Sequence, residues 1–391
     1  MRTDKTSTGI FADRIRFGKN RIRFGKILFL PALLLTLAGA VSCLDDDSLE
    51  EDNTYLGNFK ACWTAMDEHY CFFEEKGVDW DAVYEAYYPY FRDSVQNAVD
   101  EFELMASMLA TVRDGHVNLY SAFNTARYWK WYEDYPDNFD ENLLYKYYLG
   151  SNYWLSSGIY YGMFADTVAY MWYPSFSTTV SESTLDYVLA GMRQAKGLII
   201  DVRNNGGGTL TNVPVLANRF CTQKTVYSYM KHKTGKGHSD FSEPEPLYLE
   251  PQEDRYNWDA SVQPVVVLTN RSCYSATNNF VAAMRALDGT LSISSKGGLA
   301  KKNIKIMGDR TGGGGGLPFE SVLPNGWILR FSACPILDHE MNQTEDGIAP
   351  DYQVSMDSIS MYYYHADDII ESARAYIRYN TRMKYSTKAQ Q

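Results

Sequence analysis

A serine placed between a predicted strand and a predicted helix is the residue in this chain best suited to nucleophilic chemistry. Ser275 lies in the segment Asn-Arg-Ser-Cys-Tyr-Ser-Ala-Thr-Asn, residues 270–278, directly after the apolar run 264–269. That run predicts a buried strand, and apolar residues at helical spacing from Phe280 to Leu287 predict a helix. The first turn of a helix presents backbone N–H groups and the positive end of the helix dipole, which stabilise an oxyanion. The segment therefore predicts a serine acyl-transfer site.

A glycine-rich turn offers a second set of backbone amides. Residues 198–202 predict a strand, and Asn-Asn-Gly-Gly-Gly follows at 204–208. Both features also have an ordinary structural explanation, because serine is a common helix N-cap and glycine often serves turns that need a positive φ. A third segment, Arg-Asp-Gly-His at 113–116, supplies an imidazole that could accept the proton of a serine hydroxyl.

Five short motifs occur in an order that resembles one family. They are Arg-Asp-Gly-His at 113–116, Ile-Ile-Asp-Val-Arg-Asn-Asn-Gly-Gly-Gly at 199–208, Ser-Cys-Tyr-Ser-Ala-Thr-Asn at 272–278, Gly-Asp-Arg-Thr-Gly-Gly-Gly at 308–314 and Glu-Asp-Gly-Ile-Ala-Pro-Asp at 345–351. In this order they resemble the C-terminal processing (tail-specific) serine peptidases and the catalytic core of tricorn protease, over roughly residues 55–375. The resemblance implies an α/β fold, with a crotonase/ClpP-like spiral core and an N-terminal helical subdomain. It also implies hydrolysis of peptide bonds in protein or peptide substrates through Ser275.

The general base is where this chain departs from the tail-specific branch. In that branch a lysine follows Gly-Glu-Pro-Thr, whereas the corresponding stretch here, 308–314, has a glycine at the lysine position. Lys301 is near in sequence, but it precedes the strand predicted to carry this motif. Tricorn-type relatives use a histidine from the helical region instead, and His116 matches that place. The ordinary alternative is that His116 only caps the C-terminus of a helix.

The resemblance also implies the remaining members of the site. Glu345 is the candidate carboxylate that orients the base, although it could equally be a turn residue. The oxyanion donors would be the amide of Ala276 and that of Gly207 or Gly208. Cys273 could rival Ser275 as the nucleophile, but the resemblance favours the serine. We expect no cofactor and no metal. A non-catalytic peptide- or ligand-binding lipoprotein on the same fold is the alternative function.

The first 42 residues predict a lipoprotein signal peptide. A basic lead is followed by the apolar run 27–41 and then by Ser42 and Cys43. The run is too short for a confident membrane span. We expect a lipid anchor on Cys43 that attaches the protein to the outer membrane. The acidic residues that follow Cys43 favour display on the cell surface, and the periplasmic face is the alternative. An ordinary secretory signal with an incidental cysteine is the other interpretation of this segment.

Charge and cysteine content exclude other classes of protein. The chain carries a net charge of −11, and removing residues 1–42, with eight Lys/Arg and two Asp/Glu, leaves −17. Nucleic acid is therefore not an expected partner, because phosphate binding needs a basic face. The five later cysteines lack the spacing of metal ligands. Cys62 and Cys71 could form a disulfide.

The chain divides into six predicted segments. Only about fifty residues separate His116 from a predicted strand at 168–172, fewer than a complete peptide-binding PDZ domain needs. The predicted segments are the signal peptide 1–42, an acidic linker 43–54, a helical subdomain 55–116, a mixed β-containing region 117–180 without a full PDZ domain, an α/β catalytic core 181–380 and a flexible tail 381–391.

Overall fold

Seven strands form the largest sheet of the computed structural model, which describes residues 52–293 and 298–388. The strands lie in the order β15-β12-β9-β6-β5-β4-β3. From β5 to β15 each neighbouring pair is parallel, whereas β3 and β4 add an antiparallel edge. Their bounds are β3 (Trp154–Ser156), β4 (Ile159–Met163), β5 (Ala169–Trp172), β6 (Leu198–Asp201), β9 (Val265–Thr269), β12 (Ile304–Gly308) and β15 (Tyr352–Gln353).

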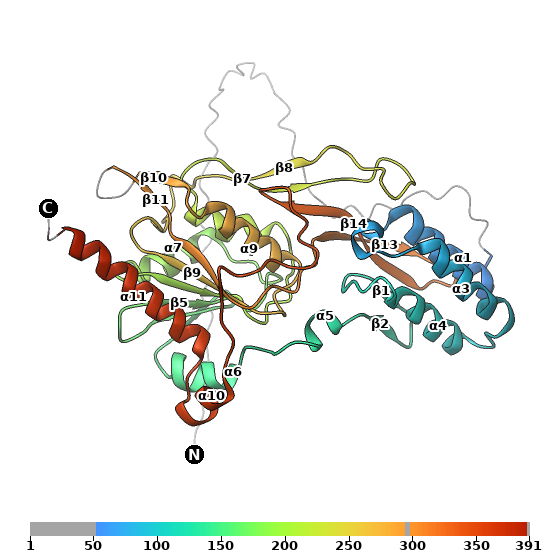
Figure 1. Cartoon of the computed structure of the whole chain (residues 1–391), viewed down its shortest axis with the longest axis horizontal. Coiled ribbons are helices and arrows are strands. Elements are labelled where there is room, and N and C mark those ends of the chain that lie inside the picture. Colours follow the sequence, from blue (N-terminus) through green and yellow to red (C-terminus); the bar gives the residue numbers. More distant parts are fainter. Residues whose placement is uncertain (1–51, 294–297, 389–391) are drawn as a thin grey trace, which may run out of the picture. The chain divides into compact units, whose positions relative to one another are not determined.

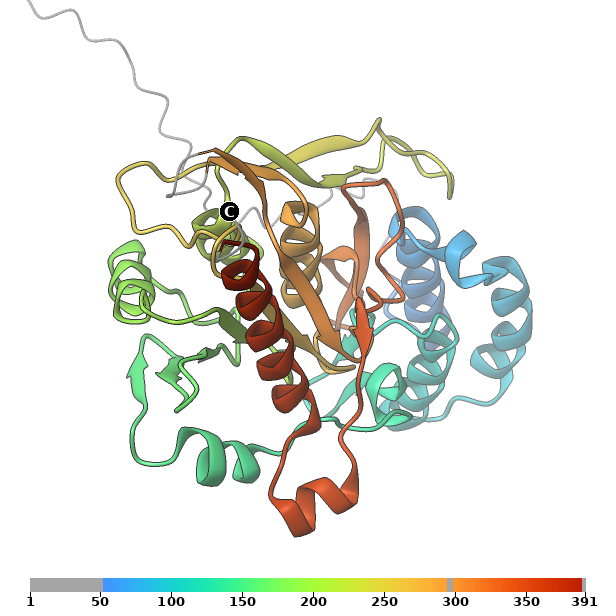
Figure 2. The same ribbon diagram turned by 60° about the vertical axis from the view of Figure 1, so that its left-hand side comes forward.

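Helices cover both faces of this sheet, as the unbroken apolar strands require. All five residues of β9 are buried, and alternate side chains enter two different cores. One core lies under three helices, and the other lies under α11, which crosses the opposite face (Figures 1 and 2). These helices are α7 (Glu182–Gly191), α8 (Asn212–Ala217), α9 (Ala276–Leu287) and α11 (Asp368–Lys388). The predicted α/β core is confirmed.

A second sheet is wholly antiparallel and carries the N-terminal helices. Its strands follow the order β2-β1-β14-β7-β8, with β13 also paired to β14. Four helices pack on its β14 side around a shared aromatic and methionine core. The elements are β1 (Asn118–Tyr120), β2 (Thr125–Arg127), β7 (Thr225–Met230), β8 (Glu245–Leu249), β13 (Gly316–Val322), β14 (Ile328–Asp338), α1 (Tyr55–His69), α2 (Phe73–Lys76), α3 (Trp80–Asp93) and α4 (Ala98–Ala110). The predicted N-terminal helical region is therefore present.

The helices begin where side-chain oxygens can satisfy their first amides. Asp79, the N-cap of α3, accepts from the amide of Ala82 at 2.9 Å. A proline commonly interrupts a helix, but α3 continues through Pro89 to Asp93. Packing beyond the proline accounts for the difference, because the Phe91 ring stacks on Phe59 with centroids 4.5 Å apart.

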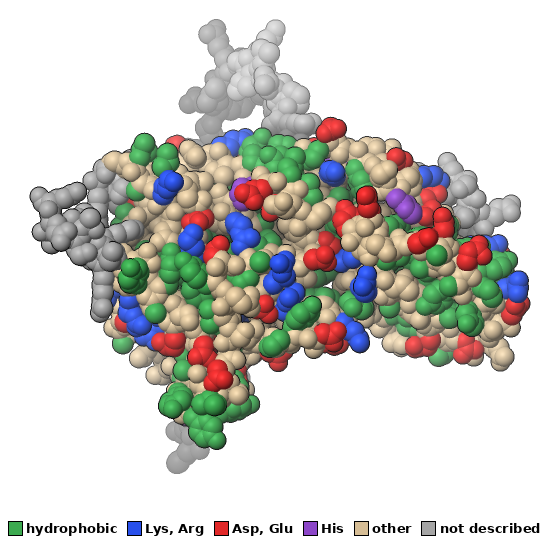
Figure 3. Space-filling model, viewed as in Figure 1, with side chains coloured by type: hydrophobic (Ala, Val, Ile, Leu, Met, Phe, Trp, Pro, Cys, Tyr) green, Lys and Arg blue, Asp and Glu red, His purple; other side chains and the backbone are tan. Residues whose placement is uncertain are grey.

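Shorter elements connect the layers. One of them is α10 (Ser358–Tyr364), whose large hydrophobic side chains are mostly exposed and gather at one end of the face shown in Figure 3. Helix α11 extends to Lys388, into the segment for which a tail was expected. The short elements are α5 (Lys130–Glu133), α6 (Glu141–Leu143), the π-helical turn η1 (Leu144–Leu149), the 3₁₀ turn η2 (Asn218–Phe220), the hairpin β10 (Leu291–Ile293) and β11 (Leu299–Lys301), and α10 (Ser358–Tyr364).

The structure tests the disulfide predicted between Cys62 and Cys71, but it does not describe the predicted signal peptide. Cys62 and Cys71 are both free and buried, so the disulfide suggested for them does not form. Cys62 lies near Glu101, whereas Cys71 lies near Asp114, which explains why the two thiols do not meet. Within 52–293 and 298–388, no helix combines the length and hydropathy that crossing a bilayer demands. Cys43 and the predicted signal peptide lie outside the described residues.

Candidate active site

Ser275 occupies a strained turn between β9 and α9. Its backbone has φ 58° and ψ −122°, a conformation that costs an L-residue about 1–3 kcal/mol. Two hydrogen bonds hold the turn, from the Ser275 amide to the carbonyl of Gly313 at 2.8 Å and from the Tyr274 amide to that of Asn205 at 3.2 Å. The Ser275 hydroxyl makes no capping hydrogen bond to the helix. The ordinary explanation, a serine that only caps α9, therefore does not describe this residue.

The glycine-rich turn after β6 lies directly against Ser275. A Cβ added to Gly207, which has φ 99°, would lie 2.8 Å from Ser275 Cβ and 3.0 Å from the amide nitrogen of Ala276. The Gly207 amide is engaged, because it donates to Asn205 Oδ1 at 3.0 Å. Within the described part of the chain, nothing accepts a hydrogen bond from the amides of Ala276 or Gly208. Gly207 and Ala276 thus meet beside Ser275, where the Ala276 amide remains available, whereas Gly208 lies against Phe176 and Ser177.

His116 follows α4 in the turn Arg-Asp-Gly-His and is buried. Its amide donates to Asp114 Oδ1 at 2.7 Å, and its ring lies 4.9 Å from that of Tyr274, centroid to centroid. Its Nδ1 is buried and has no hydrogen-bond partner among the described residues. Helix α4 ends at Ala110, and the imidazole caps no carbonyl there. The structure thus places His116 against the neighbour of Ser275, but no described hydrogen bond joins its imidazole to the Ser275 hydroxyl.

The surroundings of His116 keep its imidazole neutral. Burial lowers the pKa of His116 to about 4. Asp114 opposes this shift, and the guanidinium groups of Arg330 and Arg127 reinforce it. A neutral imidazole can accept a proton, so His116 is available as a base above about pH 4, while its lowered pKa makes it a weaker base than an ordinary histidine.

Glu345 lines a cavity together with Tyr274 and Gly115 and is 4% exposed. Its Oε1 is 2.8 Å from the Nζ of Lys76, and its Oε2 accepts from the amide of Gly315 at 2.9 Å. Burial and then the charge of Asp114 raise the pKa of Glu345 to about 8, although Lys76 acts in the opposite direction. Among the described contacts, Glu345 makes none with the His116 imidazole.

A cavity of about 370 Å³ opens beside these residues. Tyr274 lines it, and the ring of Trp131 stacks on Tyr274 with centroids 4.1 Å apart. A Cβ on Gly115 would lie 2.5 Å from Trp131 Nε1, and one on Gly312 would lie 2.4 Å from Trp131 Cε3. The two glycines, one from each of two motifs, therefore make room for a single indole ring. Trp131 therefore packs against both the histidine turn, residues 113–116, and a second glycine-rich segment, residues 312–316, which is called the glycine-rich loop below.

Other candidate groups lie elsewhere or are chemically unsuited. Burial raises the pKa of Cys273 to about 12, and its thiol donates to the carbonyl of Val202 at 3.0 Å, so it is a poor rival nucleophile. Lys301 ends β11, before β12 begins. Lys302 is buried, and its Nζ contacts only the hydroxyls of Thr222 and Thr290 among the described residues, at 2.8 and 3.0 Å.

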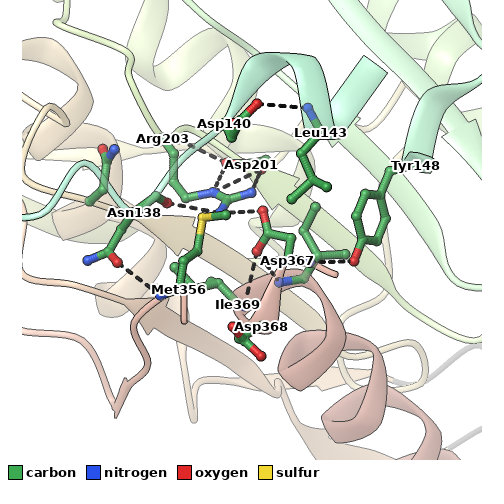
Figure 4. A network of polar contacts seen from close by, with 12 residues as sticks. Asn138, Asp140, Leu143, Tyr148, Asp201, Arg203, Met356, Asp367, Asp368 and Ile369 are labelled. Carbon is green, nitrogen blue, oxygen red and sulfur yellow. Dashed lines mark hydrogen bonds and ion pairs between the residues drawn. The ribbon is translucent and has the colours of Figure 1, made fainter. Parts of the chain in front are cut away.

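A buried ionic network fixes the strand that precedes the glycine-rich turn (Figure 4). Arg203 Nη2 lies 2.6 Å from Asp201 Oδ2, and Arg203 Nη1 lies 2.8 Å from Asp367 Oδ2. Arg203 also donates to the carbonyl of Asn138 at 3.1 Å. Asp367 in turn accepts from the amides of Ile369 and Ile370, which begin α11. The network ties the end of β6 to α11 and gives the Asp-Val-Arg motif a structural explanation.

Comparison with known proteins agrees with this geometry. The sequence profile of peptidase family S41 matches residues 167–354, and that of the tricorn protease C1 domain matches residues 52–110. A crystal structure described as a candidate peptidase from Parabacteroides merdae ATCC 43184 shares 45% sequence identity, with a TM-score of 0.75, over 83% of this chain and 97% of that one. The chain belongs to peptidase family S41. Membership indicates a peptidase, and the family is of serine type.

More distant S41-like structures share the fold alone. Mature CPAF complexed with lactacystin has a TM-score of 0.61 at 11% identity, over 86% of this chain and 99% of that one. Tricorn protease has a TM-score of 0.50 at 14% identity, over 84% of this chain and 37% of that one. No curated protein matches the sequence.

The S41 and tricorn profiles do not span every candidate residue. Ser275, Gly207 and Glu345 fall within 167–354, whereas His116 falls between the two matched ranges. Sequence reasoning missed the role of Lys76, because nothing in its local motif predicts an ion pair with a residue 269 positions later in the chain. The contact between Trp131 and Tyr274 was not predictable either, because Trp131 lies within a stretch rich in aromatic residues and nothing in that stretch sets it apart.

Proposed function

We propose that this S41 member is an active serine peptidase with Ser275 as its nucleophile. The observation that carries the proposal is the strained Ser275 turn, in which the hydroxyl makes no capping hydrogen bond and the Ser275 Cβ and the amide of Ala276 both lie against Gly207. A backbone held at φ 58° without a capping role is the kind of outlier from which function is properly inferred. The substrate would be a protein or peptide.

In this proposal His116 is the general base. It would accept the proton of the Ser275 hydroxyl as the oxygen attacks the scissile carbonyl, and then donate it to the leaving amine. The amides of Ala276 and Gly208 would stabilise the oxyanion, with Gly207 shaping the turn. Support comes from the neutral, buried imidazole with an unpartnered Nδ1 beside Tyr274. The base is then a histidine, as in the tricorn-like branch, rather than a lysine.

Glu345 would act at a distance from the imidazole. It lies near Asp114, which holds the His116 amide, and it binds the glycine-rich loop through the Gly315 amide. We therefore assign it the support of both catalytic segments rather than direct orientation of the ring.

A fluorophosphonate probe tests the nucleophile without knowledge of the substrate. The probe should attach to Ser275 in the wild-type chain, and Ser275→Ala should abolish labelling. Ser272→Ala is the matched control, because Ser272 lies in the same turn, and it should label at close to the wild-type rate. Labelling that persists in Ser275→Ala and disappears in Ser272→Ala would contradict the assignment.

A non-catalytic peptide- or ligand-binding protein is the second candidate. It is favoured by the lack of a described hydrogen bond between the His116 imidazole and the Ser275 hydroxyl. In that case the probe would not label Ser275, while peptides would still bind beside Trp131.

We further propose that the protein is an outer-membrane lipoprotein anchored through Cys43 and displayed on the cell surface. The support is the basic lead and apolar run before Cys43 and the acidic run after it. A position on the periplasmic face is the alternative.

A further inference from the structure

One buried lysine connects the helical region to two of the motifs around Ser275. Lys76 ends α2, its side chain is 10% exposed, and its Nζ lies 2.8 Å from Glu345 Oε1 and 3.3 Å from Asp346 Oδ1. Its carbonyl accepts from Arg113 Nη2 at 3.0 Å. Arg113 begins the Arg-Asp-Gly-His turn, and Glu345 begins the Glu-Asp-Gly-Ile-Ala-Pro-Asp stretch. Lys76 therefore contacts the first residue of each motif.

The carboxylate that pairs with Lys76 supports the backbone on which Ser275 rests. Glu345 Oε2 accepts from the Gly315 amide at 2.9 Å, and the Glu345 carbonyl accepts from the Gly314 amide at 3.1 Å. The adjacent Gly313 carbonyl accepts from the Ser275 amide at 2.8 Å. An unbroken series of direct contacts thus runs from the Lys76 ammonium to the strained serine turn.

A second buried carboxylate, Asp114, lies near Glu345, and the positive charge of Lys76 is needed to offset the repulsion between the two. Asp114 is 1% exposed, and it accepts from the His116 amide and from the Ser332 hydroxyl. Its charge acts on Glu345 strongly enough to raise the pKa of that carboxyl, second only to burial. Two carboxylates in a dry interior repel each other, and one buried ammonium offsets part of that repulsion.

Other titratable groups also face the ion pair between Lys76 and Glu345. Asp346 is largely exposed and shares the Lys76 ammonium. Burial raises the pKa of Tyr70, Cys71 and Tyr274, with Asp114 and Glu345 adding to the shift, so these groups are neutral at physiological pH. Burial alone would lower the pKa of Lys76, but Glu345 and Asp114 raise it above its ordinary value.

We propose that Lys76 is a positioning residue that holds Glu345 and the glycine-rich loop in place and so sets the reactivity of Ser275. This inference rests on the proposed function, because it assigns to the helical region a part in the same site. Lys76 touches neither Ser275 nor a reacting atom in the described contacts. Its effect would pass through Glu345, Gly313 and the Ser275 amide.

The test compares three lysine variants of the full chain by the rate of fluorophosphonate labelling at Ser275. Lys76→Met keeps most of the side-chain volume and removes the charge, and it should label about 10- to 100-fold more slowly, as a misplaced catalytic group does. Lys76→Arg keeps the charge and should stay within about threefold of wild type. Lys302→Met is the matched control, because it removes a buried lysine whose Nζ donates to the hydroxyls of Thr222 and Thr290, outside the contacts between Lys76 and Glu345, and it should label at the wild-type rate.

A second measurement separates charge compensation from packing. The unfolded state releases the Glu345 proton at a lower pH than the folded state does, and without Lys76 the folded state should keep that proton to a still higher pH, which widens the pH range over which stability is lost. The Tm of Lys76→Met should therefore fall more steeply than that of wild type between pH 6 and pH 9, and Lys76→Arg should follow wild type.

The outcomes are distinguishable. Slow labelling of Lys76→Met, rescue by arginine and a steeper Tm slope support the proposal. Labelling of Lys76→Met at the wild-type rate overturns it, whatever the slope. If wild-type Ser275 is not labelled at all, the proposed function fails, and an unchanged Tm slope in Lys76→Met would then overturn the charge-compensating role as well.

Discussion

Gly207 and Ser275 lie so close together that a side chain at position 207 would collide with Ser275. A Cβ on Gly207 would lie 2.8 Å from the Ser275 Cβ, which is closer than real Cβ contacts allow. The same added carbon would lie 3.0 Å from the amide of Ala276. The glycine is therefore part of the shape of the site and not only a flexible turn residue.

Gly207→Ala should abolish labelling of Ser275 and destabilise the fold by roughly 2 kcal/mol or more, because it adds a clash to a backbone at φ 99°. Labelling and urea unfolding measure the two effects. Gly206→Ala is the matched control, since an added Cβ there meets nothing within 4 Å. If Gly206→Ala were as damaging as Gly207→Ala, the close approach would not be the cause.

Ser275→Gly should be more stable than Ser275→Ala by about 1 kcal/mol, although both should be inactive. Glycine adopts φ 58° without the penalty that alanine pays there, and no capping hydrogen bond is lost in either variant. Urea unfolding of the two variants decides the matter, because equal stabilities would show that the turn is not strained.

The stability of the protein should depend on pH through His116. Its pKa is about 4 in the folded chain and near 6.5 when unfolded, so the unfolded state binds the extra proton first as the pH falls. The stabilisation is fully present above pH 6.5 and is lost as the pH falls towards 4, by about 3 kcal/mol. His116→Gln should lack this part of the pH dependence. The check is the difference in unfolding free energy between pH 6.5 and pH 4.5, which should be smaller in the variant than in wild type.

Cys43→Ala should release the protein from membranes into the soluble fraction, because the lipid on that cysteine would be its anchor. Fractionation followed by immunoblotting measures the partition. Protease treatment of intact cells expressing the wild-type chain distinguishes display on the surface from the periplasmic face. Unchanged membrane partition of the variant would rule out this anchor.

The sequence predicted the local parts of the site because strand and helix periodicity are local signals. The run 265–269 became β9, the residues after Ser275 became α9, and both glycine-rich turns lie where the motifs place them. Ser275, Ala276 and Gly207 could therefore be brought together from sequence alone, through the resemblance and the parallel order of β6 and β9.

The contacts that hold the site together were not predictable in this way. The ion pair between Lys76 and Glu345 and the stack of Trp131 on Tyr274 join segments that are distant in the chain. Neither contact leaves a periodic or compositional signal. The burial that lowers the pKa of His116 is also a property of the packed fold, and it lowers the pH at which activity should rise from near 6.5, the ordinary histidine value, towards pH 4–5.

The most direct test of the central claim is the pH dependence of Ser275 labelling in wild type and in His116→Ala, with the adduct located by mass spectrometry. Wild type should carry the adduct on Ser275, with a rate that rises as His116 loses its proton near pH 4–5 and then levels off. His116→Ala should label about 10² to 10⁴ more slowly, whereas Lys301→Ala and Lys302→Ala should match wild type. An adduct on another residue, or a dead Lys301→Ala beside an active His116→Ala, would contradict a Ser275–His116 mechanism.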